Sequence, residues 1–237
     1  MKAVLLGSYS SRKYLVGNII LGRQAFEPED INSSCVQSEG EVCGQRVTLV
    51  KAPGWLRGND ICNTPELFKT EAILSVSPGL HCFILVVNGD LPFKTVHKKT
   101  IKQHLEFFFG DKVWAHTIVV FSRSGHLDRK TVEEGTRRQG KPLQALVEAC
   151  GNRYHVLCDD DKDREQEVKA LFEKIDAMVA ENGFYESDFE WIQNAESKRK
   201  EVDRRAVELF QRSQQQRRLL RSLLTGQFSM FDAYVCF

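Results

Sequence analysis

Short apolar runs alternate with amphipathic segments along most of the chain. The runs are five to seven residues long and rich in Val, Ile, Leu and Phe, as expected of strands buried on both faces of a parallel sheet. They predict strands at 2–6, 46–50, 81–87, 116–121 and 153–157.

The segments between these runs carry apolar side chains three or four positions apart, which is typical of helices. They predict helices at 13–21, 64–76, 95–109, 131–150 and 164–181. Strands that alternate with helices indicate an α/β fold in which parallel strands are joined by right-handed crossovers. In such a fold ligands bind beyond the carboxyl ends of the strands.

The pattern changes after Gly183. Residues 195–224 contain no glycine or proline and are rich in charged side chains and glutamine, which predicts one or two long helices. Apolar stripes run along this segment at Val202, Ala206, Leu209 and Phe210, and again at Leu220, Leu223 and Leu224. The predicted organisation is an α/β domain over 1–183, a helical extension over 184–228 and an unassigned tail over 229–237.

Composition excludes several classes of function. A formal net charge of +1 argues against a general nucleic-acid binder, which would be clearly basic. The seven cysteines contain no C-x-x-C pair, so we expect no zinc or thioredoxin-like site, and free thiols point to the cytoplasm. The six histidines show no triad or metal spacing, and we predict no catalytic residue and no metal ligand.

The most informative segment follows the first strand. Residues 7–14 read G-S-Y-S-S-R-K-Y, where a phosphate-binding loop would read G-x-x-x-x-G-K-[ST]. Gly7 and Lys13 keep their places, but Arg12 replaces the second glycine and Tyr14 replaces the hydroxyl that binds magnesium. The strand, loop and helix are retained while part of the chemistry is changed.

Two further turns show the same kind of change. After the second strand, Lys51-Ala52-Pro53-Gly54 keeps the glycine of the D-x-x-G turn of P-loop GTPases, but a lysine replaces the acid beside the magnesium position. After the fourth, Ser122-Arg123-Ser124-Gly125 ends in glycine where these GTPases carry the aspartate that reads guanine. Two lost hydrogen bonds to a charged group would cost about 3–6 kcal/mol. The switch threonine is also missing, because no threonine occurs between Leu15 and Val47.

With these pieces, the chain resembles the GIMAP family of immunity-associated, septin-related GTPases. The similar segments are A-P-G-W at 52–55, S-P-G-L-H-C-F-I-L-V-V at 77–87 and K-P-L-Q-A-L-V-E-A-C-G-N-R-Y-H-V-L at 141–157. The resemblance implies a Ras-like P-loop G domain with a C-terminal helical extension. It also implies GTP or GDP as ligand, assembly with other G domains as homo- or hetero-oligomers, and a cytoplasmic location that includes membrane surfaces.

Carried over position by position, the resemblance assigns one nucleotide site. Its expected members are Gly7, Ser8, Tyr9, Ser10, Ser11, Arg12, Lys13, Tyr14, Leu15, Pro53, Gly54, Ser122, Arg123, Ser124 and Cys158. The positions at which the family's roles are lost are Arg12, Tyr14, Lys51 and Gly125. These departures predict weak nucleotide binding, poor magnesium binding and little or no hydrolysis.

Three hypotheses remain open at this point. The first is a pseudo-GTPase that acts as an interaction or assembly module through its surfaces. The second is a weak but genuine GTP or GDP binder that hydrolyses little. The third is an enzyme with unrecognised catalytic residues. The arginine-rich segment 198–221 adds two docking hypotheses, the acidic stretch 159–167 or an anionic membrane surface, beside the simpler interpretation of a solvated helix.

Overall fold

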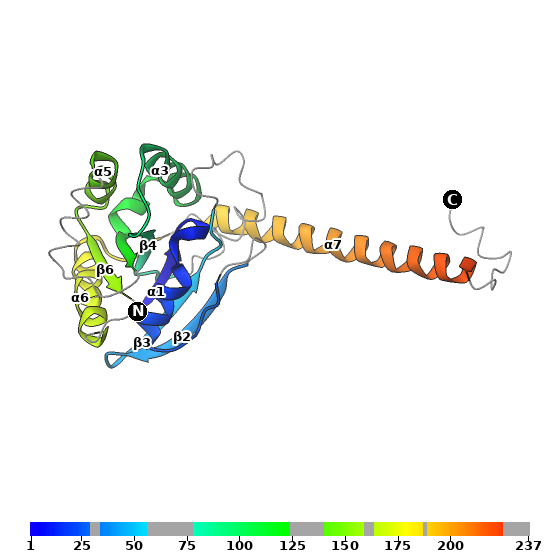
Figure 1. The fold of residues 1–237 in the computed structure, drawn as a ribbon, viewed down its shortest axis with the longest axis horizontal. Coiled ribbons are helices and arrows are strands. Elements are labelled where there is room, and N and C mark those ends of the chain that lie inside the picture. The colour runs from blue at the N-terminus through cyan, green and yellow to red at the C-terminus, as the bar shows by residue number, and fades with distance from the viewer. Residues whose placement is uncertain (29–33, 56–77, 124–139, 159–163, 187–188, 225–237) are drawn as a thin grey trace. The chain divides into compact units, whose positions relative to one another are not determined.

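A computed structural model of the chain describes residues 1–28, 34–55, 78–123, 140–158, 164–186 and 189–224 (Figure 1). The chain divides into two compact units, Met1–Ala195 and Glu196–Phe237. The first unit contains the α/β fold.

The centre of this unit is a six-stranded sheet with the strand order β2-β3-β1-β4-β5-β6. Its strands are β1 (Lys2–Leu6), β2 (Val36–Val42), β3 (Gln45–Lys51), β4 (Cys82–Asn88), β5 (Thr117–Arg123) and β6 (Tyr154–Cys158). All neighbouring pairs are parallel except β2 with β3. The five predicted strands are confirmed to within two residues at each end, and the mostly parallel α/β fold is confirmed with them.

The sequence pattern missed β2. This edge strand reads V-Q-S-E-G-E-V and none of its residues is buried, so it lacks the apolar alternation that marks a strand with one buried face. Its strand character comes from the antiparallel pairing with β3, in which Val36 lies opposite Lys51 and Val42 opposite Gln45.

The helices of this unit are α1 (Lys13–Leu21), α3 (Thr95–Phe109), α5 (Lys141–Ala149) and α6 (Arg164–Asn182), with 3-10 turns at Tyr9–Ser11 and Asp111–His116. The predictions for 13–21, 95–109 and 164–181 are confirmed. A continuous helix over 131–150 is wrong, because Gly140 has a φ of +84° and α5 begins just after it. The helix predicted at 64–76 lies outside the described residues.

Two apolar clusters lie on opposite faces of the sheet. Alternate residues of β1 divide between them, with Val4 and Leu6 in one cluster and Ala3 and Leu5 in the other. The first cluster includes buried side chains of α3 and α5, and the second includes buried side chains of α1 and α6. Figure 1 labels these four helices around the sheet. This division is the reason why the sheet's carboxyl edge, rather than a face, is open to a ligand.

Several cysteines and histidines are buried in this unit. Cys82 is fully buried, and burial raises the pKa of its thiol. His116 is buried just before β5 and His155 is buried within β6, and burial lowers the pKa of His116. His81 is partly buried at the start of β4, and burial lowers its pKa as well.

The core continues past Gly183 to Tyr185. This side chain is 4% exposed, its hydroxyl donates to the Phe109 carbonyl at 2.7 Å, and its amide donates to the Leu80 carbonyl at 2.8 Å. Tyr185 therefore links the segment after α6 to the end of α3 and to Leu80, two residues before β4. The predicted domain boundary at 183 stays a prediction.

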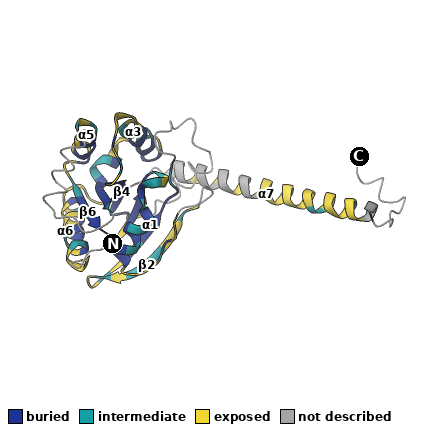
Figure 2. Ribbon diagram, viewed as in Figure 1, coloured by how far each residue is buried: buried dark blue, intermediate teal, exposed yellow. Residues whose placement is uncertain are grey.

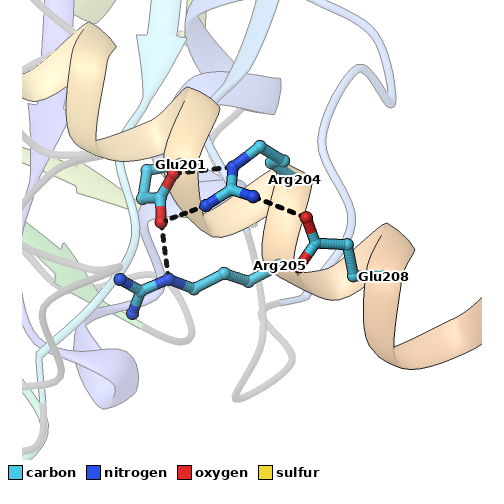
Figure 3. A network of polar contacts seen from close by, with 4 residues as sticks. All are labelled: Glu201, Arg204, Arg205 and Glu208. Carbon is cyan, nitrogen blue, oxygen red and sulfur yellow. Dashed lines mark hydrogen bonds and ion pairs between the residues drawn. The ribbon is translucent and has the colours of Figure 1, made fainter. Parts of the chain in front are cut away.

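The segment after residue 188 forms one helix, α7 (Phe189–Leu224), of 36 residues. Most of its described side chains are exposed (Figure 2), and Leu209 and Phe210 are each 64% exposed. Figure 3 shows Arg204 between Glu201 and Glu208 on this helix. Hydrogen bonds from Arg204 and Arg205 hold the pKa of Glu201 at about 2. Within the described residues, no helix is both long enough and apolar enough to span a membrane.

Replacing Tyr185 by phenylalanine tests how much the hydrogen bond from its hydroxyl to the Phe109 carbonyl stabilises the fold. Tyr185→Phe leaves the buried Phe109 carbonyl without its donor, so we expect unfolding in urea to lose about 1–3 kcal/mol. The half-buried Tyr154 supplies the matched control, Tyr154→Phe, for which we expect a smaller loss.

The same variant has a pH signature. Burial raises the pKa of Tyr185 to about 12, so the unfolded chain releases this proton at a lower pH than the folded chain. The free energy of unfolding of the wild type should therefore fall as the pH rises from about 10 towards 12. Tyr185→Phe lacks the ionisable hydroxyl, so its free energy of unfolding should fall less over the same range. Equal alkaline slopes for the two proteins would contradict this role.

Candidate nucleotide site

The segment after β1 has the backbone of a phosphate-binding loop. Gly7 has a φ of +154°, and a Cβ there would lie 2.6 Å from the Val86 carbonyl oxygen. A 3-10 turn at Tyr9–Ser11 follows, and α1 begins at Lys13. The strand–loop–helix arrangement predicted from the sequence is therefore present.

Lys13 lies within this loop. Its side chain is 1% exposed, and its ammonium donates to the carbonyls of Gly7 at 3.0 Å and Ser8 at 3.3 Å. The loop thus encloses a buried positive charge at the first turn of α1, where the helix dipole also favours an anion.

Arg12 has the backbone of the glycine that it replaces. Its φ of 63° and ψ of 39° are left-handed, a conformation that strains most residues other than glycine. Its guanidinium pairs with the Asp90 carboxylate, with 2.9 Å between Nη1 and Oδ2. The second oxygen of Asp90 lies 3.6 Å from Nε of Arg123, the last residue of β5.

Side chains and backbone from three neighbouring segments hold the loop. The Ser122 hydroxyl donates to the Ser11 carbonyl at 2.8 Å, and the Asn88 amide donates to the Ser10 carbonyl at 3.1 Å. The Tyr9 amide donates to the Trp55 carbonyl at 2.8 Å. These bonds bring the carboxyl ends of β1, β4 and β5 and the turn after β3 to one place, as the fold predicts.

The turn after β3 carries the most consequential change. Lys51 ends β3 opposite Leu5 of β1, and its side chain is 4% exposed. Its ammonium donates to the Glu27 carbonyl at 2.8 Å. Pro53 is buried and Gly54 partly buried, and Trp55 packs on His104 with 4.9 Å between the ring centroids.

Among the described residues, the two positions that supply magnesium ligands in P-loop GTPases do not fit a magnesium ion. Magnesium is held by oxygen ligands, mainly carboxylates, hydroxyls and water. At the two positions that supply such ligands in P-loop GTPases, this chain has Lys51 and Tyr14, and the half-buried ring of Tyr14 packs against the cluster that contains α1. Among the described residues, no group of three or more His, Cys, Asp or Glu side chains could hold a metal ion.

The remaining predicted site residues are placed as follows. Ser8 and Ser10 lie with their hydroxyl oxygens 3.4 Å apart, and Leu15 packs against the cluster beneath α1. Cys158 is buried at the end of β6, and its backbone lies opposite Arg123 in the parallel ladder between β5 and β6. Ser124 and Gly125 lie outside the described residues, so the loss of guanine recognition stays a prediction.

The sequence analysis did not predict two residues that contact the phosphate loop or its arginine. Asn88 comes directly after the apolar run of β4 and Asp90 lies two residues later, and both contact the loop or its arginine. Their position after a buried strand was the available signal, because parallel strands deliver such residues to the sheet's carboxyl edge.

Comparison with known proteins identifies the family of this chain. The model of the AIG1 family matches residues 1–206. The chain belongs to the AIG1 family. Its relatives include a human protein named GTPase IMAP family member 8, which is 27% identical over 189 residues, so the predicted resemblance to these GTPases is confirmed. That match covers 77% of this chain and 27% of the relative, so the chain spans about a quarter of the relative's length.

Solved structures agree with the fold of this AIG1 family member. Toc33 of Arabidopsis thaliana in complex with GDP and Mg²⁺ superimposes with a TM-score of 0.61 at 15% identity, over 79% of this chain and 88% of Toc33. A structure from work on dimerization of the chloroplast translocon components atToc33 and psToc159 gives a TM-score of 0.55 at 15% identity, over 74% and 82% of the two chains. The fold is therefore that of a Ras-like G domain.

The left-handed backbone at Arg12 gives a stability prediction. Arg12→Asn and Arg12→Ala lose the same ion pair with Asp90, but asparagine tolerates the left-handed region better than alanine. We expect Arg12→Asn to be more stable by about 0.5–1 kcal/mol in urea unfolding. Equal stabilities would show that residue 12 does not keep this backbone.

Proposed function

We propose that this AIG1 family member is a pseudo-GTPase, a G domain that does not run a magnesium-dependent hydrolytic cycle and acts as an interaction or assembly module. The observation that carries the proposal is the buried Lys51 ammonium, bonded to the Glu27 carbonyl at the carboxyl end of β3.

Electrostatics explains why this ammonium matters. A divalent cation about 4 Å from an ammonium is repelled by about 8 kcal/mol at an effective dielectric constant near 20, twice the value for two unit charges. Lys51 is held by a hydrogen bond and by burial, so it cannot move away without cost. A second magnesium ligand is missing at Tyr14, because its phenol oxygen lies several ångströms further from the backbone than the serine hydroxyl that binds the metal in P-loop GTPases.

The interaction role has separate support. Dimerization is important for the GTPase activity of the chloroplast translocon components atToc33 and psToc159, whose G-domain fold this chain shares. In the present chain, α7 carries exposed apolar side chains such as Leu209, Phe210 and Leu220, which is the kind of surface that partners cover. We propose other G domains as partners, with a cytoplasmic location that includes membrane surfaces.

Calorimetric titration with GTP tests the proposal. We expect excess Mg²⁺ not to tighten GTP binding by the wild-type chain relative to EDTA, because Lys51 and Tyr14 replace the two side chains that would hold the metal. A submicromolar, magnesium-dependent affinity would contradict the pseudo-GTPase.

A restored variant supplies the positive control. Arg12→Gly, Tyr14→Ser and Lys51→Asp together return the family's residues, and we expect Mg²⁺ to tighten GTP binding at least about tenfold in this triple variant. Thermal melts of the triple variant confirm that it is folded before the titration is interpreted.

The second candidate function is weak nucleotide binding without metal. Lys13 supports it, because the ammonium lies inside the loop at the positive end of α1. Millimolar GDP or GTP in EDTA should then raise the melting temperature of the wild-type chain, and Lys13→Met should abolish the rise. Unchanged melting of the wild type would exclude this candidate.

A further inference from the structure

The Asp90 carboxylate lies between two arginines, one in the phosphate loop and one at the end of β5. The Asp90 oxygens lie 2.9 Å from Nη1 of Arg12 and 3.6 Å from Nε of Arg123. The side chains of Arg12, Asp90 and Arg123 are 31%, 24% and 18% exposed, so all three are partly withdrawn from solvent. Their attraction is therefore screened less than that of a surface pair.

The turn that carries Asp90 is built to hold this position. The Asp90 amide donates to the side-chain oxygen of Asn88 at 3.0 Å, and the Asn88 side-chain amide donates to the Ser10 carbonyl at 3.1 Å. The Gly89 amide donates to the Ser122 carbonyl at 2.9 Å. The carboxylate is thus fixed to the phosphate loop on one side and to β5 on the other.

Glycine at position 89 lets Arg123 approach. A Cβ on Gly89 would lie 2.9 Å from Cγ and 3.2 Å from Cδ of Arg123, so the arginine stem runs directly over this glycine. Its guanidinium is thereby held near the same carboxylate that Arg12 binds. Two guanidiniums that converge on one oxyanion are a common arrangement for recognising phosphate.

The local charge favours an anion without a metal. Among the described residues at the loop and its neighbouring strand ends, Arg12, Arg123, Lys13 and Lys51 carry four positive charges, and Asp90 and Glu27 carry two negative charges. We propose that Asp90 is an internal competitor that occupies a metal-independent site for phosphate groups, as free pyrophosphate or as the diphosphate of a nucleotide. This inference rests on the proposed function, in that magnesium has no part in the site.

The consequence concerns affinity. A phosphate group that binds Arg12 and Arg123 must displace the Asp90 carboxylate and remain near its negative charge. Removing that charge while keeping the size of the side chain should tighten phosphate binding by about tenfold, and the affinity should fall with added salt.

Calorimetry with pyrophosphate in EDTA tests the inference on Asp90→Asn. We expect this variant to bind at least about fivefold more tightly than the wild type. Asp176→Asn, which removes the same charge from the exposed face of α6, is the matched control and should stay within about twofold of the wild type. The gain should disappear in the double variant Arg12→Met with Asp90→Asn.

Several outcomes would overturn the inference. An Asp90→Asn affinity equal to or weaker than that of the wild type would do so, as would a gain that survives the loss of Arg12. If the asparagine variant does not fold, Asp90→Ser applies the same test with a smaller neutral side chain. A parallel titration with GDP tells whether the phosphate group comes from a nucleotide.

The titration also separates this inference from the proposed function. Adding Mg²⁺ to the wild-type titration with GTP tests the pseudo-GTPase, whereas the comparison of Asp90→Asn with the wild type is made in EDTA. Tighter GTP binding in Mg²⁺ would contradict the proposed function. The inference on Asp90 would still be decided by the titrations of Asp90→Asn and wild type in EDTA.

Discussion

The hydrogen bond between the Lys51 ammonium and the Glu27 carbonyl is the interaction on which the interpretation of this protein depends. It fixes a buried positive charge at the carboxyl end of β3, beside the strand that leads into the phosphate loop. A buried ammonium that is hydrogen-bonded is costly to disturb, whereas one without an acceptor would be costly to keep. A cation of the chain itself therefore lies at the edge of the sheet that serves a metal-bound nucleotide in P-loop GTPases, and the proposed pseudo-GTPase rests on this placement.

The phosphate loop is held by bonds within the protein. Ser122 and Asn88 donate to its carbonyls, and the Trp55 carbonyl accepts from its Tyr9 amide. Lys13 adds two further bonds from inside the loop. The phosphate loop is thus supported by contacts within the protein that do not depend on a ligand.

The parts of the fold that the sequence predicted are those with a strong period. The buried runs of β1, β4 and β5 and the amphipathic repeat of α6 can be recognised because each buries the same kind of side chain at regular intervals. The edge strand β2 was missed because it buries no side chain, and Tyr185 was missed because the short segment after Gly183 has no period. The loop's replaced residues can be recognised directly, since their spacing is fixed. The position of Asp90 after a buried strand was a signal, but its pairing with Arg12 could not be predicted, nor could the bond to the Glu27 carbonyl, because only the tertiary fold brings these groups together.

The most direct measurement is a crystal structure grown with a non-hydrolysable GTP analogue and Mn²⁺, with anomalous data collected to locate the metal. If Lys51 has taken the place of the divalent cation, no anomalous peak will lie between α1 and the end of β3, and the Lys51 ammonium will remain on the Glu27 carbonyl. An octahedral Mn²⁺ that bridges an ordered triphosphate at that position, with Lys51 displaced, would contradict this conclusion.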